Sequence, residues 1–364
     1  MRLAFVHDWL TGMRGGEKAL EVLCERFPDA ELFTLVHVRG SVSPVIERRI
    51  IHTSFVQHLP LASRYYRQYL PLFPTAVEHF NFDRFDTIVS ISHCCVKSIV
   101  RPGRAWHLCY CLTPMRYAWD QFEAYFGERR VGRLASGVMR RVMARLARWD
   151  RDTAGRADRY VAISHHVAGR IRRYYNREAI VVYPPVDTNF FQPDALSSTS
   201  TVPSALIVSA LVPYKRIEVA IDACRTARVP LTVIGDGPDR ARLEAYANGS
   251  ATFLGRRSDE ELRDAYRRSA VTLLPGEEDF GIVPLEAQAC GRPVVALGRG
   301  GACETIVPGE TGLLVDEPSA DAFEDAIRRA LDHRFDASAI RAHAAAFGRT
   351  RFGDAMETLI RNAQ

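Results

Sequence analysis

The stretch "LAFVHDWLTGMRGGEKALEVLCERF", residues 3–27, places a short apolar run ahead of a glycine-containing loop and a segment with helical periodicity. In that last segment Leu20, Leu23, Cys24 and Phe27 fall at positions that share one face of a helix. The same order of strand, loop and helix returns in "ALIVSALVPYKRIEVAIDAC", residues 205–224. We therefore predict two halves that each open with a strand–loop–helix unit.

Further short apolar runs follow in both halves, with helical segments between most of them. They are "DTIVSI" and "RYVAI" in the first half and "LTVIGDG", "ATFLG", "VTLLPG" and "PVVAL" in the second. This alternation is typical of parallel sheets covered by helices, which bind ligands at the carboxyl ends of their strands. The predicted fold class is α/β, with two Rossmann-like doubly wound domains facing each other across a cleft.

The chain length of 364 residues fits two domains. We predict an N-terminal domain over residues 1–185 and a linker over 186–203, where Pro, Ser and Thr are frequent. A C-terminal domain should cover residues 204–345. The amphipathic segment 346–364 is expected to form a helix that crosses back to the first domain.

Composition excludes several classes of protein. A hydrophobic content of 47% with 25% charged residues is that of a globular protein, and no run is long enough to span a bilayer. The eight cysteines show no zinc-like spacing, which favours buried thiols and a cytoplasmic location. The net charge of +5 is too small to indicate nucleic acid as a partner. The first residues are interpreted as a strand and not as a secretion signal, because His7 and Asp8 interrupt the apolar run.

The segment "GEEDFGIVPLEAQACGRPV", residues 276–294, holds two glutamates around a predicted helix start. Pro284 suits a first helical turn, so we expect a helix from Pro284 to Cys290 with an anion site at its free N–H groups. Glu286, in that first turn, could accept hydrogen bonds from the vicinal hydroxyls of a ribose. Glu278 could bind another polyol. Alternatively, Glu286 only complements the helix dipole and Glu278 is a solvated charge.

The longer stretch "EEDFGIVPLEAQACGRPVVALGRGGACETIVPGETGLLV" resembles the signature of retaining, family 4-type glycosyltransferases of the GT-B fold. In that family a glutamate is followed by seven residues and a second glutamate, and Glu278 and Glu286 match both ends. The resemblance implies that Glu278 binds hydroxyls of the donor sugar and Glu286 binds the nucleotide ribose. It also implies that the diphosphate and sugar contact the backbone groups of four consecutive residues, Phe280, Gly281, Ile282 and Val283.

The motif "SALVPYKRIEVAI" resembles the diphosphate clamp of the same family. The resemblance places Lys215 on the lysine of the clamp, where a fixed cation would stabilise the charge that develops on a leaving diphosphate. Many relatives carry an arginine directly after the strand, whereas this chain has Ala210 and Leu211 there. Arg216 is a candidate substitute. The alternative is an exposed helix residue.

Two further glycine-containing motifs, one in each half, bear on nucleotide binding. "TGMRGGEKALE" resembles a glycine-rich loop that faces the donor phosphates, where Gly15 and Gly16 would let backbone approach the ligand. A plain turn before a helix is the competing interpretation. "IGDGP", residues 234–238, lacks the third glycine of a dinucleotide fingerprint and so gives only weak support to NAD binding.

The acceptor side is less well defined. "HLCYCLTPMRYAWD", residues 107–120, resembles an element of one bacterial branch of the family, in which many relatives have a sugar-contacting histidine where this chain has Leu112. Either that contact is lost or a neighbour such as His93 supplies it. Arg116 and Tyr117 form a cation and aromatic group of the kind that binds sugars or phosphate, with packing as the alternative.

Residues 129–151 contain eight arginines and one acid, interleaved with apolar residues at helical spacing. A basic amphipathic helix of this kind can bind an anionic membrane surface. A core-facing helix with a solvated basic side is the alternative.

Together these features predict a retaining hexosyltransferase that needs no metal, because no acidic cluster of the Asp-x-Asp type is visible. The first candidate donor is GDP-mannose, since the branch resembles O-antigen and exopolysaccharide mannosyltransferases. The acceptor would be a glycan or a polyprenyl-linked sugar, reached from the cytoplasm or from the inner face of the plasma membrane. The alternatives are a nucleotide-sugar-binding scaffold without transferase activity, or another enzyme with the same lobes such as a sugar-nucleotide epimerase.

Overall fold

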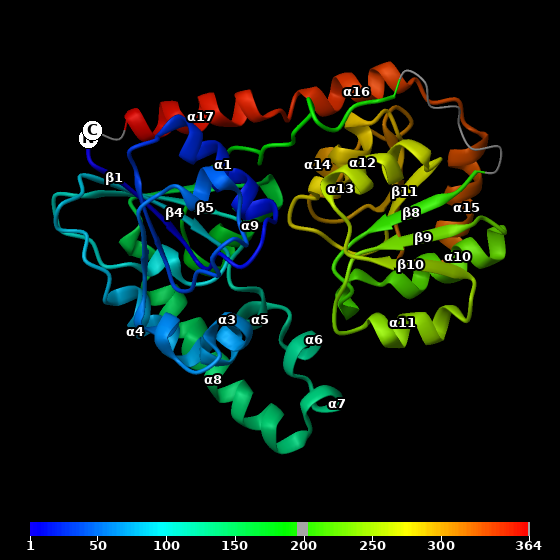
Figure 1. Cartoon of the computed structure of the whole chain (residues 1–364). Helices are drawn as coiled ribbons and strands as arrows, with labels where there is room; N and C mark the ends of the chain where they lie inside the picture. The colour runs from blue at the N-terminus through cyan, green and yellow to red at the C-terminus, as the bar shows by residue number, and fades with distance from the viewer. Residues whose placement is uncertain (195–202, 363–364) are drawn as a thin grey trace. The chain divides into compact units, whose positions relative to one another are not determined.

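The computed structural model describes residues 1–194 and 203–362 (Figure 1). Its contacts divide the chain into two compact units, one of Met1–Pro185 with Phe352–Gln364 and the other of Val186–Arg351. Each unit is built on one parallel sheet with helices packed against it. The predicted class of two Rossmann-like α/β domains is therefore confirmed.

The sheet of the first unit has the strand order β3-β2-β1-β4-β5-β6-β7, and all neighbours are parallel. Its strands are β1 (Leu3–His7), β2 (Glu31–Thr34), β3 (Ile51–Thr53), β4 (Thr87–Ser92), β5 (Trp106–Cys111), β6 (Arg159–Ala162) and β7 (Ala179–Val181). The chain runs outward from β1 in one direction and then resumes at β4 on the other side. The neighbouring carboxyl ends of β1 and β4 therefore form the switch point at which such sheets bind ligands.

Helices of the first unit include a C-terminal helix that lies beside the end of α1 (Figure 1). Arg26 of α1 forms ion pairs with Asp354 at 2.7 Å and Glu357 at 3.0 Å, and the Phe352 ring packs 5.5 Å from Tyr110. The helices are α1 (Gly15–Arg26), α2 (Pro44–Glu47), α3 (Ala62–Tyr65), α4 (Phe73–Glu78), α5 (Arg116–Trp119), α6 (Phe122–Phe126), α7 (Glu128–Val131), α8 (Arg133–Asp152), α9 (His165–Tyr175) and α17 (Arg349–Arg361).

The second unit repeats the plan with strand order β10-β9-β8-β11-β12-β13, again parallel throughout. Its strands are β8 (Ala205–Val208), β9 (Leu231–Ile234), β10 (Ala251–Gly255), β11 (Val271–Leu274), β12 (Val294–Leu297) and β13 (Gly312–Val315). Its helices are α10 (Ile217–Ala227), α11 (Arg240–Ala247), α12 (Asp259–Arg268), α13 (Ile282–Ala289), α14 (Ala302–Thr305), α15 (Ala320–Asp332) and α16 (Ala337–Ala345). The switch point of this sheet lies between β8 and β11.

The predicted linker, 186–203, lies partly outside the described residues, which exclude 195–202. Its described beginning belongs to the second unit. Val186 pairs with Gly348 in an isolated bridge, and the buried Phe191 ring packs 5.9 Å from the ring of Tyr266.

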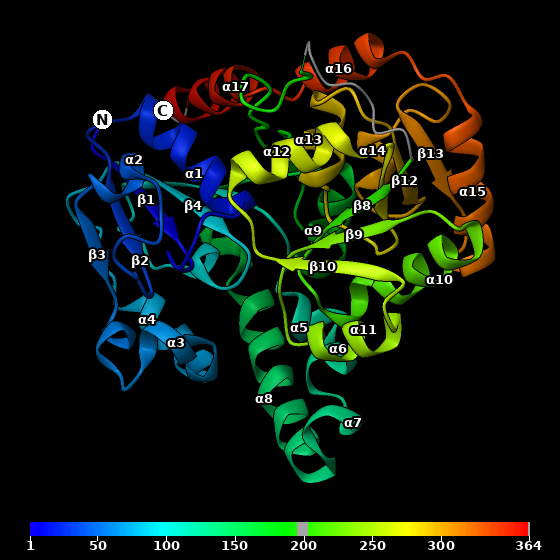
Figure 2. The ribbon, with the colours of Figure 1, turned by 45° about the vertical axis from the view of Figure 1, so that its right-hand side comes forward.

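The basic segment 129–151 is not one continuous helix, because Gly132 adopts a φ of +82° between α7 and α8. In α8, Leu146 is buried in the core of the first unit, whereas Leu134 is 89% exposed and Val138 is 57% exposed. The predicted apolar stripe thus packs only at its C-terminal end, and α8 extends away from the sheet with α7 at its far end (Figure 2). Within the described residues, no helix combines the length and the apolar character needed to cross a membrane.

Candidate functional site

The two loops at the switch point of the second unit carry an ion pair. Lys215 ends a short 3-10 turn after β8, and Glu278 lies in the loop after β11. The Lys215 Nζ atom contacts Glu278 Oε1, and the two side chains are 10% and 18% exposed. The same ammonium lies 5.1 Å from the centre of the Tyr214 ring. Two residues predicted from separate motifs therefore lie together where the fold binds ligands.

Close backbone packing fixes the loop that carries Glu278. A Cβ atom on Gly276 would lie 2.7 Å from Lys215 Cα, and one on Gly300 would lie 2.3 Å from the carbonyl oxygen of Glu278. Gly301 donates its N–H to that carbonyl at 2.8 Å, and a Cβ atom here would lie 2.2 Å from Phe280 Cα. The loops after β8 and β12 thus hold the Glu278 backbone from two sides. The sequence prediction assigned no role to these glycines, although "GRGG" stood inside the quoted motif.

Helix α13 begins two residues earlier than predicted, at Ile282, and ends at Ala289. Gly281, with a φ of +93°, turns the chain into the helix, and Pro284 lies in the first turn where no N–H is needed. The predicted anion site is therefore limited to the N–H groups of Gly281, Ile282 and Val283, which have no intrahelical acceptor. Glu286 lies in the second turn, so the prediction of a first-turn carboxylate is wrong.

Glu286 is only 5% exposed, and its Oε2 accepts a hydrogen bond of 3.0 Å from the hydroxyl of Tyr266. Burial, with a further contribution from the neighbouring Glu286, raises the pKa of Tyr266, so the phenol keeps its proton and donates. One carboxylate oxygen is thereby fixed in place. Sequence reasoning missed Tyr266, because it lies on α12 and only the fold brings it to Glu286.

Arg216 is exposed and takes a left-handed conformation, with a φ of +50°, directly before α10. This conformation costs a residue other than glycine roughly 1–2 kcal/mol, which marks the turn as strained. Lys215 is buried and Arg216 exposed, so the two consecutive cations occupy different environments.

Ala210 and Leu211 stand where many relatives carry an arginine. Ala210 is exposed, whereas Leu211 is buried and Gly237 packs against the Leu211 backbone. Gly237, the second glycine of "IGDGP", therefore serves close packing.

In the first unit, Asp8 follows β1 and is fully buried. Its two oxygens accept four backbone N–H groups from residues 93–96, at 2.7 to 3.1 Å. The carboxylate therefore fixes the loop after β4 against the end of β1. His93 Nδ1 lies 3.2 Å from Asp8 Oδ2, and the His93 ring meets Trp9 edge-on at 4.4 Å. Burial lowers the pKa of His93, and its side chain is 26% exposed.

Gly15 and Gly16 were predicted to lie in the loop before α1. In the structure they are the first two residues of that helix. The loop ends at Arg14, which precedes the helix and donates its backbone N–H to Glu17 at 3.1 Å. A Cβ atom on Gly16 would lie 2.7 Å from Leu112 Cδ1 and 3.1 Å from His7 Nε2, so Gly16 lies close to both side chains.

Arg116 and Tyr117 begin the short helix α5, and both are half-buried. The Tyr117 hydroxyl lies 2.6 Å from Cys94 Sγ in the interior, a contact that favours packing for this residue. Burial raises the pKa of Tyr117, which keeps the phenol protonated. Trp119 donates its indole N–H to Asp150 at 2.8 Å and so ties α5 to α8.

Asp8, Cys94 and Cys95 place one potential metal-ligand atom each within 4.8 Å of one another. The Asp8 oxygens are already occupied by the four backbone N–H groups described above. Burial raises the pKa of both thiols and disfavours the thiolate that a metal requires. This cluster therefore fits a capped turn better than a metal site. Seven of the eight cysteines are buried as predicted, but Cys303 is exposed.

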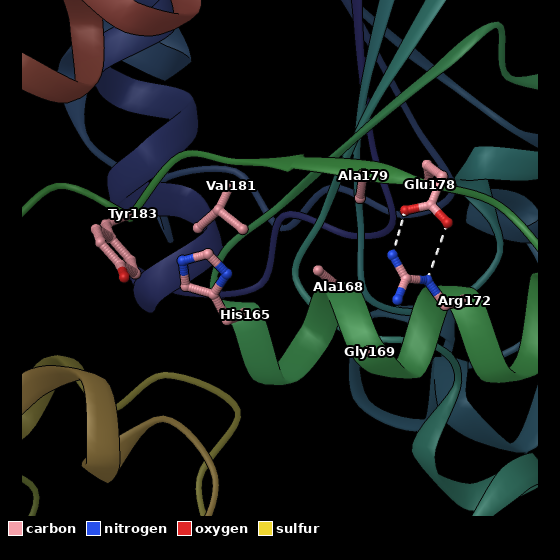
Figure 3. Close-up of a pocket in the computed structure, with 8 residues that line it drawn as sticks. All are labelled: His165, Ala168, Gly169, Arg172, Glu178, Ala179, Val181 and Tyr183. Carbon is pink, nitrogen blue, oxygen red and sulfur yellow. Dashed lines mark hydrogen bonds and ion pairs between the residues drawn. The ribbon is translucent and has the colours of Figure 1, made fainter.

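A pocket of about 480 Å³ opens between α9 and the segment from Glu178 to Tyr183 (Figure 3). The rings of His165 and Tyr183 lie at one end of it, and Arg172 and Glu178 form an ion pair at the other. Because these two charges neutralise each other, the pocket offers little attraction to a phosphate. None of the sequence-predicted site residues lines it.

Comparison with known proteins bears on the second unit most directly. Residues 190–348 match the family described as "Glycosyl transferases group 1". These residues form a group 1 glycosyltransferase domain. The match covers less than half of the chain and agrees with the predicted glycosyltransferase family for this domain, which includes Lys215, Glu278 and Glu286.

Curated relatives match parts of the chain. A D-inositol 3-phosphate glycosyltransferase of Mycolicibacterium smegmatis is 31% identical over 225 residues, which cover 55% of this chain and 52% of the relative. A GDP-mannose-dependent alpha-mannosyltransferase of Mycobacterium tuberculosis is 37% identical over 138 residues, 36% of each chain. The chain thus spans about half or less of these relatives' lengths.

Solved structures match the whole chain. The sucrose-phosphate synthase of Thermosynechococcus elongatus has a TM-score of 0.74 at 21% identity, covering 100% of this chain and 99% of that one. At this identity the likeness shows the fold alone. It agrees with the GT-B class predicted from the sequence.

Proposed function

We propose that this chain is a retaining glycosyltransferase that moves a hexose from a nucleotide sugar to a glycan or polyprenyl-linked acceptor. The observation that carries the proposal is the arrangement around α13, where Glu278 is paired with Lys215 before the helix and Glu286 is held by Tyr266 inside it. Free backbone N–H groups at the helix start lie between the two glutamates in the sequence. This order suits a ligand with a sugar, a diphosphate and a ribose.

Each group has a role in this proposal. The first N–H groups of α13 and the Lys215 ammonium bind the diphosphate and stabilise the charge that develops when the glycosidic bond breaks. Glu286 accepts hydrogen bonds from ribose hydroxyls. Glu278 exchanges its contact with Lys215 for hydroxyls of the donor sugar. Arg216, exposed beside Lys215, is a second candidate cation for the diphosphate.

The proposed reaction takes place on one face of the sugar. The bond between the anomeric carbon and the diphosphate oxygen breaks, the acceptor oxygen bonds to the same face, and the leaving phosphate takes the acceptor proton. Glu278 is then a positioning residue. His93 and Arg116 of the first unit are the acceptor-side candidates, and Tyr117 is the weakest of the three because its hydroxyl faces Cys94.

GDP-mannose is the first candidate donor. Its support is the 37% identity to a relative whose name specifies GDP-mannose, together with the resemblance to polysaccharide mannosyltransferases. The proposed product would belong to a surface polysaccharide such as an O-antigen or exopolysaccharide.

The test is nucleotide release from a panel of nucleotide sugars, with and without a lipid-linked acceptor. Acceptor-dependent release of GDP from GDP-mannose is the expected result, and release from another donor would replace only the donor assignment. Binding without release from any donor would favour the scaffold alternative. Acceptor-independent conversion of the sugar would favour an epimerase.

We also propose that the exposed part of α8 docks on an anionic membrane. Leu134 and Val138 are exposed apolar residues, and exposed arginines follow them along the helix. Apolar insertion combined with attraction to anionic lipid is how basic amphipathic helices bind the interface. A peripheral position on the inner face of the plasma membrane would bring the enzyme to a polyprenyl-linked acceptor.

Vesicle sedimentation tests the membrane proposal. The double variant Leu134→Ser, Val138→Ser should lose at least about tenfold in affinity for phosphatidylglycerol vesicles, because each side chain contributes about 1.5–3 kcal/mol when buried. The matched control is Ile180→Ser, an exposed apolar residue on the edge strand β7, which should bind like the unaltered protein. Equal binding by both variants, or equal binding to phosphatidylcholine, would contradict docking through α8.

A further inference from the structure

His7, at the carboxyl end of β1, is a fully buried histidine whose tautomer follows from its contacts. Its Nδ1 lies 3.0 Å from the backbone carbonyl oxygen of Trp9. A carbonyl oxygen only accepts hydrogen bonds, so Nδ1 must carry the proton. Burial, with a smaller contribution from His93, lowers the pKa of His7 to about 3, so the ring is neutral near pH 7. The other nitrogen, Nε2, is therefore an unprotonated acceptor.

The Nε2 atom faces the start of α1. It lies 3.1 Å from the position that a Cβ atom of Gly16 would take, and no residue within the described part of the chain donates to it. The N–H groups of Gly15 and Gly16 open a helix of 12 residues and have no intrahelical acceptor. The buried acceptor Nε2 therefore lies next to Gly16, in the first turn of α1. A buried acceptor without a partner costs about 1–3 kcal/mol, so a ligand hydroxyl or an ordered water that donates to Nε2 would be stabilising.

The chemistry of this place selects its ligand. An ionised phosphate oxygen only accepts, so it would meet the helix N–H groups favourably but would face the bare lone pair of Nε2. An ammonium group only donates and would be opposed by the helix dipole. A hydroxyl does both, because its oxygen accepts from the backbone and its hydrogen reaches the imidazole.

We propose that His7 Nε2 and the first N–H groups of α1 bind a hydroxyl group of a sugar. This inference rests on the proposed function, and it revises the expectation that Gly15 and Gly16 meet the donor phosphates. The hydroxyl belongs either to the donor hexose or to the acceptor sugar. His7 acts as a positioning residue whose acceptor atom orients that hydroxyl.

Leu112 packs against the same glycine. Its Cδ1 lies 2.7 Å from the same Cβ position on Gly16, next to the His7 imidazole. The Leu112 side chain is half-buried. The residue that departs from the family pattern thus lies beside Gly16, which the buried His7 imidazole also approaches.

Imidazole nitrogen NMR on the full-length protein tests the proposal directly. The His7 signals are assigned by their loss in His7→Gln, and in the free protein Nε2 should resonate as an unprotonated nitrogen from pH 5 to pH 8. Adding GDP alone should leave this signal in place. Adding GDP-mannose should move it toward the protonated position if the donor supplies the hydroxyl, and adding methyl mannoside should do so if the acceptor supplies it.

His107 is the internal control in the same spectra, because it is also buried and its Nε2 already lies 2.8 Å from the Ser90 hydroxyl. Its signals should not move with any ligand. Movement of the His7 signal with GDP alone would overturn the proposal, as would an unmoved signal while calorimetry shows that both sugars bind. Failure of every nucleotide sugar in the donor panel to bind would instead overturn the proposed function, and this inference with it.

Kinetics give a second measurement. His7→Phe keeps a ring of similar size without the acceptor and should raise KM for the sugar ligand about tenfold, while the affinity for GDP stays the same. His7→Gln places an oxygen near the position of Nε2 and should restore part of the loss. Equal losses in the two variants, including loss of GDP affinity, would indicate a structural role only.

Discussion

Gly300 offers a sharp test of how backbone packing places Glu278. In Gly300→Ala the new Cβ atom would lie 2.3 Å from the Glu278 carbonyl oxygen, whereas ordinary van der Waals contact begins at 3.4 Å. One of the two segments must therefore move by about 1.1 Å. Since a displacement of about 1 Å in positioned groups can reduce turnover about a hundredfold, we expect kcat to fall by about that factor.

The control for this variant is Gly309→Ala. Gly309 has a φ of +82°, close to the +64° of Gly300, but no atom lies within 4 Å of its Cβ position. Both alanines bear the left-handed strain of roughly 1–2 kcal/mol, and only Gly300→Ala adds overlap, which costs about 1–3 kcal/mol more. Urea denaturation would measure the stability difference, and nucleotide release under saturating donor would measure kcat. If the two variants turn over at the same rate, the loop contact does not position Glu278.

Two further predictions concern buried hydrogen bonds and protons. Tyr266→Phe removes the donor to Glu286, and because a hydrogen bond to a charged group contributes about 1.5–3 kcal/mol, calorimetry should show at least tenfold weaker nucleotide-sugar binding. The exposed Tyr246→Phe should bind normally, and equal affinities of the two variants would contradict the role of Tyr266. Burial raises the pKa of Glu17 from 4.5 to about 7, so the folded protein keeps a proton that the unfolded chain loses, and the unfolding free energy should fall by about 3 kcal/mol from pH 4.5 to above pH 7. Glu17→Gln should abolish this part of the dependence in urea titrations at pH 5 and pH 8, and an unchanged slope would show that burial of Glu17 does not cause it.

Local patterns in the sequence predicted much of the fold. The apolar runs that form β1, β4, β6 and the strands β8 to β12 were recognised, because a strand buried on both faces is continuously apolar. β5 was recognised only as part of "HLCYCLTPMRYAWD", which was interpreted as a family motif and not as a strand. The start of α13 was misplaced because a glycine with φ of +93° can turn directly into a helix, and composition does not report φ.

The candidate site was partly predictable for a related reason. Glu278, Glu286 and Lys215 stand in motifs whose spacing is visible along the chain. Tyr266 could not be found, since its partner lies 20 residues away on another helix. His7 was noted only as a polar interruption of an apolar run, and its role depends on contacts with other elements of the first unit.

The central claim is a division of roles between the two glutamates of the second unit, and initial rates of nucleotide release across donor concentrations test it most directly. Glu278→Gln should lower kcat by more than tenfold with a nearly unchanged affinity for the nucleotide diphosphate, because the residue positions the sugar. Glu286→Ala should chiefly weaken donor binding, because the ribose loses its acceptor. Equal loss of kcat and of nucleotide affinity in both variants would contradict the account.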